Sequence, residues 1–529
     1  MGAVRLCPAR REPANELHAR ARYEGCLAKC RPKTMWAVLS GAPSEVAVAS
    51  QLRITIIGAG VAGLVAAYEL EQLGHQVEIL EGSSRIGGRI YTHRFGSDAS
   101  APFVELGAMR IPSHHRNTLS YIHQLGLDHK LETFKTLFSD AAAYHFTDAG
   151  FVRLRHAAQV LVEEFRARLA GDGYRDEEIL FGTWLTAIGN AIAPANFRDS
   201  IFEDISLELL KLVKGIDLTP FLRGDHKDRF DLHGFFAAYP HIRSSSSGRL
   251  NRFIDDILNE TSPDLLRLAG GMDQLVRALA ERIRGPIRCG HEVVGLAVRD
   301  HDVLVDIRQG DHIVTKRCDY VLCTIPFSLL RRLRLCGFSE EKLAVIRNVQ
   351  YWSATKVAFL CAEPFWVRDG IDGGASFIGG RVRQTYYPPV EGDPDRGAVL
   401  LASYTMGDDA DVIGGMDPSR RHAVVLHEVS RMHPELLAPG MVRDVVSLAW
   451  GQHRWSCGGG VTRWGKDAAA CEEERALAAR PEKRLFFAGE HCSSTTAWME
   501  GAIESAIHAV REITRDEPRT PVAVARHHM

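Results

Sequence analysis

The sequence has little that would tie the protein to a metal cluster, a nucleic acid or a membrane. Its 11 cysteines, in 529 residues, form no CxxC pair, so neither a zinc cluster nor a disulfide framework is predicted. The net charge of −2 gives no attraction to nucleic acid or to an anionic membrane. The most apolar run, residues 54–68, contains three glycines and is too short for a membrane span.

The first 50 residues also lack the apolar segment of a secretory signal. We predict that residues 1–50 form an N-terminal extension of the folded part. Because unpaired cysteines are typical of a reducing compartment, we expect a cytoplasmic protein. The hydrophobic and charged fractions, 45% and 25%, are those of a globular protein, and the length allows two or three domains.

Residues 52–81 have the spacing of a strand–helix–strand unit that binds a dinucleotide. The apolar run RITII precedes Gly58, Gly60 and Gly63, and a second apolar run, QVEIL, leads to Glu81. In such a unit the first glycine permits a tight turn, the second lets the backbone approach a pyrophosphate, and the third lets helix and strand pack closely. The helix N-terminus favours phosphate, and we expect Glu81 to accept hydrogen bonds from a ribose.

Two further glycine-containing stretches favour FAD over NAD. SSRIGGR brings Gly88 and Arg89 beside the predicted phosphate site, where the arginine supplies positive charge. Far downstream, Gly489 and Glu490 follow the apolar run RLFFA and precede a predicted helix over residues 498–510. A glycine–acid turn of this kind suits the ribityl hydroxyls and the polar edge of a flavin. NAD does not need these additional turns, so we predict FAD.

The stretch VELGAMRIP, residues 104–112, places one charged side chain, Arg110, among small and apolar neighbours. A buried guanidinium without a partner is costly, so Arg110 must meet an anion. We predict that the missing anion is the carboxylate of a bound substrate. A simple amine substrate has no carboxylate and would gain nothing from this arginine.

The sequence resembles the FAD-dependent amine oxidase superfamily, most closely its L-amino-acid oxidases, in four stretches: GAGVAGLVAAYELEQLGHQVEILEGSSRIGGR, VELGAMRIP, VLCTIPFSLL and FFAGEHCSSTTAWMEGAIESA. The resemblance spans about residues 52–513. It implies an α/β fold with a Rossmann-like FAD-binding domain, a mixed-sheet substrate domain and a helical insertion. The predicted FAD-binding domain comprises residues 51–95, 256–345 and 466–515, the substrate domain 96–150 and 346–465, and the helical domain 151–255.

The resemblance also assigns roles to individual residues. Arg110 matches the arginine that pairs with the substrate carboxylate, Tyr404 the tyrosine that supports it, and Lys356 a catalytic lysine that holds a water near flavin N5. Ala497 and Trp498 match residues that line the substrate cavity. The cofactor-binding residues predicted from the motifs and the resemblance together are Gly58, Gly60, Ala62, Gly63, Glu81, Gly88, Arg89, Gly107, Ala108, Met109, Arg110, Val293, Trp450, Gly489, Glu490 and Trp498.

The activity implied by the resemblance is oxidation of the Cα–N bond of an L-amino acid. A hydride passes from Cα to non-covalent FAD, and the products are an imino acid, which water converts to an α-keto acid and ammonia, and hydrogen peroxide. Aromatic residues in LHGFFAAYPHI, residues 232–242 of the helical insertion, favour an aromatic or apolar amino acid. The implied partners are the amino acid, oxygen and a second copy of the chain in a homodimer, with no catalytic metal.

Three other functions stay open. An L-amino-acid 2-monooxygenase, which decarboxylates its substrate to an amide, shares these motifs. An amine or polyamine oxidase is disfavoured by Arg110 and by WSCGGGVT, residues 455–462. There, Gly459 and Gly460 stand where amine oxidases of the mitochondrial type have a flavin-linked cysteine and a tyrosine, and Cys457 is displaced. The third alternative is a redox-silent scaffold that binds FAD.

Overall fold

The glycine-rich turn lies at the end of a strand in a five-stranded parallel sheet. The computed structural model describes residues 51–98, 100–169, 171, 173–245 and 248–515, so the predicted extension over residues 1–50 lies outside them. In order across the sheet, the strands are β12 (Ile287–Arg288), β2 (Gln76–Leu80), β1 (Arg53–Ile57), β16 (Tyr320–Cys323) and β25 (Leu485–Phe487). The apolar runs RITII, QVEIL and RLFFA form or contain the strands β1, β2 and β25, so the two strands of the predicted dinucleotide-binding unit are confirmed.

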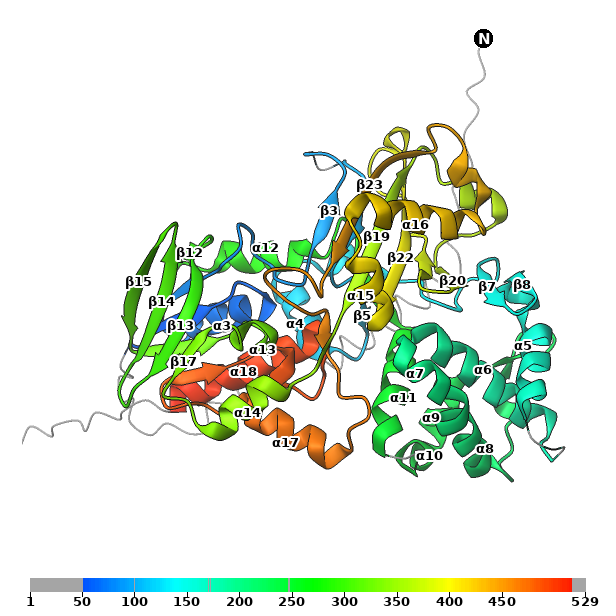
Figure 1. The fold of residues 1–529 in the computed structure, drawn as a ribbon, viewed down its shortest axis with the longest axis horizontal. Helices are drawn as coiled ribbons and strands as arrows, with labels where there is room; N and C mark the ends of the chain where they lie inside the picture. Colours follow the sequence, from blue (N-terminus) through cyan, green and yellow to red (C-terminus); the bar gives the residue numbers. More distant parts are fainter. Residues whose placement is uncertain (1–50, 99, 170, 172, 246–247, 516–529) are drawn as a thin grey trace, which may run out of the picture. The chain divides into compact units, whose positions relative to one another are not determined.

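Four helices pack with this sheet around one apolar core: α3 (Val61–Gln72), α4 (Arg116–Gln124), α12 (Asp273–Arg282) and α18 (Met499–Arg515). Figure 1 shows α3 and α18, from opposite ends of the described chain, side by side. Helix α3 starts directly after Gly60, and Gly74 (φ +87°) follows its end. A left-handed glycine is a common helix terminator, so the predicted ending of this helix at Gly74 is confirmed.

A four-stranded sheet follows the same part of the chain. Its order is β15 (His312–Cys318), β14 (Val303–Gln309), β13 (Glu292–Val298) and β17 (Arg334–Cys336). The apolar stretch GHEVVGLAV, residues 290–298, indicates a strand, and β13 lies within it. The remaining helices of four or more residues near these sheets are α13 (Phe327–Leu330), α14 (Glu340–Asn348) and α17 (Ala468–Ala479).

A seven-stranded mixed sheet carries several predicted site residues. Its strands, in order, are β23 (Val442–Ala449), β19 (Ala354–Cys361), β22 (Ala398–Met406), β21 (Arg383–Tyr386), β20 (Ala375–Gly379), β7 (Tyr144–Thr147) and β8 (Gly150–Arg153). All eight residues of β19 are buried, because neighbouring strands and α15 (Asp408–Gly414) cover it. Lys356 and Tyr404 are opposite each other in the antiparallel pair of β19 and β22.

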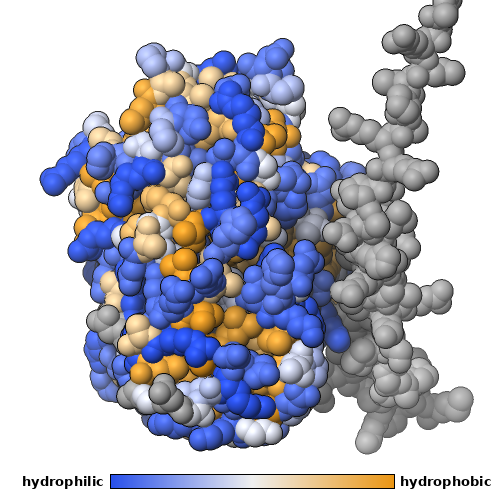
Figure 2. All heavy atoms as spheres, turned by 90° about the vertical axis from the view of Figure 1, so that its right-hand side faces the viewer, coloured by the Kyte–Doolittle hydropathy of each residue, from blue (hydrophilic) through white to orange (hydrophobic). Residues whose placement is uncertain are grey.

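Residues 154–260 form helices around a second apolar core. They are α5 (Leu154–Arg168), α6 (Asp176–Ile192), α7 (Ala195–Ser200), α8 (Leu207–Val213), α9 (Leu232–Ala238), α10 (Pro240–Ser245) and α11 (Gly248–Glu260). The apolar spacing in RHAAQVLVEEFRARLA, residues 155–170, indicates a helix, and α5 covers all but the end of this stretch. Figure 2 views the molecule from the side on which these helices lie in Figure 1, and hydrophobic residues are interspersed among hydrophilic ones there.

The aromatic residues of LHGFFAAYPHI belong to this helical core. Phe235 and Phe236 on α9 are buried, and their rings pack against each other and against Phe181. Neither lines the cavity that holds the predicted site residues. The prediction that this stretch supplies the substrate pocket is wrong, because its aromatic rings face the interior of the helical bundle.

Candidate active site

A cavity of about 620 Å³ brings the predicted motifs together. Its volume is in the range of small-molecule sites. The predicted residues that line it are Gly58, Gly60, Ala62, Glu81, Gly88, Arg89, Gly107, Ala108, Val293, Lys356, Tyr404, Trp450, Gly489, Glu490, Ala497 and Trp498. Gly63, Met109 and Arg110 are not among the lining residues.

The glycine-rich turn leaves room for a ligand at one of its three glycines. Gly58 has φ +103°, a conformation that favours glycine. A Cβ on Gly63 would fall far inside contact distance of the Gly58 carbonyl oxygen, so this glycine allows α3 to pack against β1. A Cβ on Gly60 would have no protein atom within 4 Å. Open space at Gly60, at the N-terminus of the 12-residue helix α3, fits the phosphates of FAD.

Glu81 follows β2 and connects it to the glycine-rich turn. Its Oε2 accepts a hydrogen bond from the Ala59 N–H and its Oε1 from the Ser83 N–H, both at 2.8 Å. The carboxylate is buried and lines the cavity. This geometry is suited to a ribose hydroxyl, and that role of Glu81 stays a prediction.

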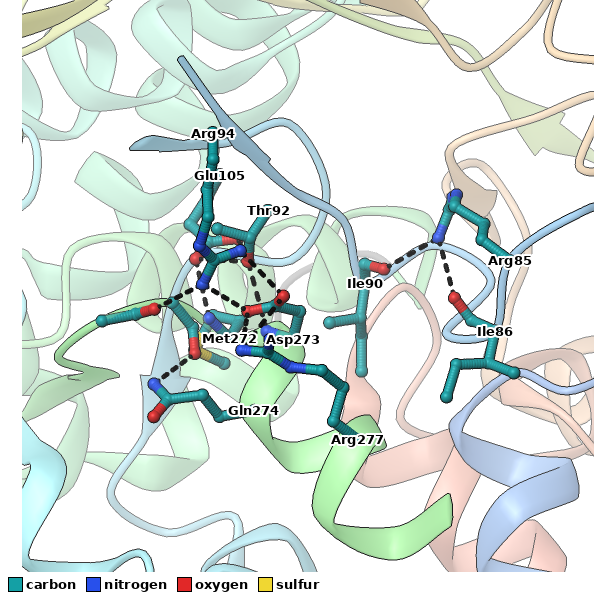
Figure 3. A network of polar contacts seen from close by, with 12 residues as sticks. Arg85, Ile86, Ile90, Thr92, Arg94, Glu105, Met272, Asp273, Gln274 and Arg277 are labelled. Atoms are coloured by element: carbon teal, nitrogen blue, oxygen red, sulfur yellow. Dashed lines mark hydrogen bonds and ion pairs between the residues drawn. The ribbon is translucent and has the colours of Figure 1, made fainter. Parts of the chain in front are cut away.

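The loop after β2 is shaped by the Arg85 side chain. Its Nη1 donates to the carbonyl oxygens of Ile86 (3.1 Å) and Ile90 (3.3 Å), as Figure 3 shows, and its Nη2 donates to the Gly88 carbonyl oxygen at 2.6 Å. These bonds hold the loop in a compact turn whose next residue, Arg89, lines the cavity.

Arg89 is paired within the chain. Its Nη1 lies 2.8 Å from Oε1 of Glu490, and Oε2 of Glu490 accepts hydrogen bonds from the N–H groups of Val461 (3.2 Å) and Ala497 (3.0 Å). Burial raises the pKa of the Glu490 carboxyl, but Arg89, His491 and the hydrogen bond from Ala497 together outweigh burial, and the pKa lies below its usual value. The two predicted residues form one ion pair, and the role of Arg89 beside the phosphates stays a prediction.

Lys356 projects from the buried strand β19 into the wall of the cavity. Its Nζ donates to the carbonyl oxygens of Glu105 (3.0 Å) and Gly107 (2.7 Å). Burial, reinforced by the positive charge of Arg110 and opposed by Glu105, lowers the pKa of Lys356 to about 7. This lysine therefore changes its charge near neutral pH, as an acid–base group does.

Glu105 is the titratable group next to this lysine. Its carboxylate accepts hydrogen bonds from the Met272 N–H (2.7 Å) and from the Thr92 hydroxyl (2.9 Å), in the network of Figure 3. Burial raises the pKa of Glu105 to about 7, although these hydrogen bonds and Lys356 oppose the shift. A buried acid and a buried base thus lie next to each other, and the base lines the cavity.

Arg110 is buried, with 5% of its side chain exposed, as its apolar neighbours predicted. Its Nη2 forms an ion pair with Oε2 of Glu260, and its Nη1 donates to the Tyr386 hydroxyl at 3.0 Å. The prediction that the chain leaves this guanidinium without an anion is wrong. Strand pairing explains the contact. Arg110 directly precedes β5 (Ile111–Pro112), and Glu260 comes shortly before β11 (Leu265–Leu268). Pro112 and Leu265 are opposite each other in this pair of strands.

Aromatic rings surround the guanidinium of Arg110. The rings of Phe134 and Trp498 each have their centroid 5.9 Å from its Cζ. The ring of Tyr386 lies 6.4 Å from that of Tyr404. Because Trp498 and Tyr404 also line the cavity, Arg110 lies directly behind two of its lining side chains.

Three polar residues near Arg110 were not identified from the sequence: Glu260, Tyr386 and Gln384. The Tyr386 hydroxyl donates to Gln384 Oε1 at 3.1 Å, and Gln384 Nε2 donates to the Ala191 carbonyl oxygen of α6 at 2.8 Å. Glu260 and Tyr386 are 150 and 276 residues from Arg110 in the chain. No local motif marks them, so only the folded chain reveals the network.

The stretch WSCGGGVT has no room for the tyrosine of other amine oxidases. A Cβ on Gly460 would lie 2.7 Å from the Cβ of Ala497, which is closer than real Cβ contacts. Gly459 lines the cavity, but Cys457 is not among its described lining residues. Nearby, the Trp450 indole donates to the Leu106 carbonyl oxygen at 2.8 Å, which fixes its ring in the cavity wall.

Across the part of the chain that the structure describes, no helix is both long and apolar enough to traverse a bilayer. Within the same residues, no group of three or more His, Cys, Asp or Glu side chains is arranged to hold a metal ion.

The family described as "Flavin containing amine oxidoreductase" matches residues 61–514, and the chain belongs to this family. A flavin-dependent L-tryptophan oxidase of Lentzea aerocolonigenes is 67% identical over 467 residues, which cover 88% of this chain and 99% of that protein. A putative L-amino-acid oxidase of Bacillus subtilis (strain 168) is 30% identical, with 87% and 94% covered. An L-amino-acid oxidase of Mus musculus is also 30% identical, with 88% and 71% covered.

Among solved structures, putrescine oxidase has a TM-score of 0.59 at 18% identity, covering 88% of this chain and 99% of that one. This similarity confirms the predicted α/β fold of the amine oxidase type. The relatives confirm the resemblance inferred from the sequence, the FAD cofactor and the predicted class of enzyme, an FAD-dependent L-amino-acid oxidase. The predicted domain boundaries and individual site roles stay predictions.

Proposed function

We propose that the protein oxidises the Cα–N bond of L-tryptophan, and that the resulting imino acid is hydrolysed to the α-keto acid and ammonia while oxygen is reduced to hydrogen peroxide. The observation that carries this proposal is the buried Arg110 guanidinium, flanked by the rings of Phe134 and Trp498 beside the cavity. A cation for the carboxylate and aromatic faces for an indole are then in one place. The 67% identical relative is named for the same substrate.

In this proposal, Arg110 and Tyr404 hold the substrate carboxylate. Glu260 engages one N–H of the guanidinium and Tyr386 another, and a guanidinium carries five such donors. A charge-assisted pair in a buried setting fixes the orientation of Cα as well as adding affinity. Bound FAD would supply the two-electron acceptor that takes the hydride and passes its electrons to oxygen.

Lys356 is the proposed proton acceptor. The amino group must lose a proton before the Cα–N bond is oxidised, and a neutral amine on Lys356 can take it up. Burial and Arg110 make the neutral lysine available near pH 7, which is where an acid–base group is most effective.

We expect kcat/KM to rise with pH through an ionisation near pH 7 that belongs to Lys356, since the neutral amine is the active form. Replacement Lys356→Met should lower kcat/KM by about a hundredfold and remove this ionisation from the pH profile. Glu105→Gln keeps the lysine but removes the carboxylate that raises its pKa, so the ionisation should move to lower pH. A Lys356→Met profile that still rises at pH 7 would show that another group is titrating.

The substrate is tested by measuring peroxide release with each of the twenty amino acids. L-tryptophan should give the highest kcat/KM, followed by the other aromatic amino acids, because Phe134 and Trp498 favour planar rings. The same assay with D-tryptophan is the control for stereospecificity. Preference for a basic or a small amino acid would contradict the assignment to tryptophan. Absence of peroxide with all twenty amino acids would contradict the proposed activity.

Product analysis separates the alternatives that share this site. The α-keto acid marks an oxidase and the amide marks a monooxygenase, while substrate-dependent bleaching of the flavin under nitrogen excludes a redox-silent scaffold. Arg110 disfavours an amine or polyamine oxidase.

The homodimer is proposed from the family resemblance alone. The cytoplasmic location is proposed because the eight described cysteines are all free thiols.

A further inference from the structure

In the ion pair of Arg110 and Glu260, the Glu260 side chain is more exposed to solvent than that of Arg110. The Arg110 side chain is 5% exposed and that of Glu260 is 13% exposed. Oε2 of Glu260 meets the guanidinium, whereas Oε1 has no hydrogen-bond partner among the described residues. The carboxylate therefore keeps an acceptor available beside the buried cation.

The backbone around Glu260 is held by the fold. Its carbonyl oxygen accepts a hydrogen bond from the Thr136 hydroxyl at 2.9 Å, and Thr136 is buried. Four residues after Glu260 comes Asp264, whose carbonyl oxygen accepts a hydrogen bond from the Ser113 N–H at 3.1 Å. The carboxylate and Arg110 are thus kept next to each other by two connected segments.

A fixed pair of opposite charges matches an α-amino acid, which carries a carboxylate and an ammonium group on one carbon. A ligand carboxylate that reaches Arg110 necessarily brings a negative charge close to Glu260. Two like charges in direct proximity repel each other appreciably even at an effective dielectric constant of about 20. An ammonium group next to that carboxylate converts the repulsion into attraction.

We propose that Glu260 is a specificity-determining residue that receives the α-ammonium group of the substrate whose carboxylate binds Arg110. The proposal rests on the proposed function, in which Arg110 binds that carboxylate. Glu260 then selects amino acids over carboxylic acids of the same shape, while Arg110 selects them over the corresponding amines. If Glu260 only neutralised the charge of Arg110, its removal would strengthen the binding of both carboxylates, L-tryptophan included. A role in receiving the ammonium group instead predicts that L-tryptophan binds more weakly.

The test uses the FAD-loaded full chain and three ligands that share the indole ring. L-tryptophan has both charged groups, indole-3-propionate lacks the ammonium group, and tryptamine lacks the carboxylate. Peroxide release gives KM and kcat for L-tryptophan and the inhibition constants Ki of the other two. In Glu260→Gln, we expect the KM of L-tryptophan to rise about tenfold, the Ki of tryptamine to rise, and the Ki of indole-3-propionate to fall about tenfold.

Opposite shifts for the two inhibitors distinguish recognition by charge from a structural defect. Glu132→Gln is the matched control, because Glu132 pairs with a different arginine, Arg267, and its side chain is 53% exposed. Its three constants should stay at the wild-type values. Glu260→Asp keeps the charge on a shorter side chain and should show the same shifts as Glu260→Gln, but smaller.

A lower KM for L-tryptophan in Glu260→Gln, equal shifts of all three ligands, or unchanged constants would overturn the proposal. The wild type alone can also overturn it: a Ki of indole-3-propionate at or below the KM of L-tryptophan would show that no ammonium group is recognised. That result would leave tryptophan oxidation intact. A wild type that oxidises none of the twenty amino acids would instead contradict the proposed function and this inference together.

Discussion

Replacement of Arg110 with alanine is expected to lower kcat/KM for L-tryptophan by about a thousandfold while the purified protein remains yellow. Truncating one partner of a buried, hydrogen-bonded charge pair costs about 2–5 kcal/mol, and about 1.4 kcal/mol corresponds to each factor of ten. FAD should be retained because Arg110 lies behind the cavity wall and is not among the lining residues. Steady-state peroxide release and the flavin-to-protein absorbance ratio measure the two effects.

Loss of Arg110 also leaves the Glu260 carboxylate without its partner, and an uncompensated buried charge destabilises a fold by about 3–5 kcal/mol. The double variant Arg110→Ala with Glu260→Gln removes this charge and should recover stability but not turnover of tryptophan. Tryptamine is the second control: having no carboxylate, it should bind Arg110→Ala at least as well as the wild type. Normal oxidation of L-tryptophan by a yellow Arg110→Ala variant would refute the role assigned to the guanidinium.

The nucleotide-binding part of the site could be predicted from the sequence because its geometry is local. Gly58, Gly60 and Gly63 act within one turn between β1 and α3, and the reason for each glycine is a contact with its own neighbourhood. Apolar strands without alternation of polar and apolar residues likewise indicate a buried parallel sheet. In such motifs, residues that are close in the sequence are also close in the fold, so their spacing in the sequence predicts their positions.

The surroundings of Arg110 could not be predicted in this way. Its apolar neighbours indicated burial correctly, but burial does not identify the anion. Glu260 reaches it through the pairing of β5 with β11, and Tyr386 through the order of strands in the seven-stranded sheet. Both depend on contacts between segments more than a hundred residues apart.

Composition was also insufficient to separate a pocket from a core. The phenylalanines of α9 would suit an indole, yet Phe235 packs against Phe181 and Phe230 with 0% of its side chain exposed. Phe134 is the ring that flanks Arg110, and nothing in its sequence neighbourhood distinguishes it. An aromatic residue has the same local pattern in either setting, since apolar burial drives both.

Two single-methyl substitutions in the glycine-rich turn should both weaken FAD binding, but for different reasons. In Gly60→Ala the new methyl group meets no protein atom within 4 Å and enters the cavity where FAD binds. The backbone at Gly60 (φ −74°, ψ 177°) is one that alanine adopts readily, so the apoprotein should be as stable as the wild type, or more stable by about 0.4–1 kcal/mol. FAD affinity should fall by about a hundredfold, as expected for a steric cost of about 3 kcal/mol.

In Gly63→Ala the methyl group would instead collide with the Gly58 carbonyl oxygen, which forces α3 away from β1. Overpacking of this kind costs about 1–3 kcal/mol or more, so both FAD binding and the stability of the apoprotein should decrease. Titration of each apoprotein with FAD, together with urea unfolding, measures the two quantities separately. A Gly60→Ala apoprotein that binds FAD with wild-type affinity would show that the cofactor binds elsewhere. Equal loss of stability in both variants would contradict the distinction between Gly60, which faces the ligand, and Gly63, which faces the rest of the fold.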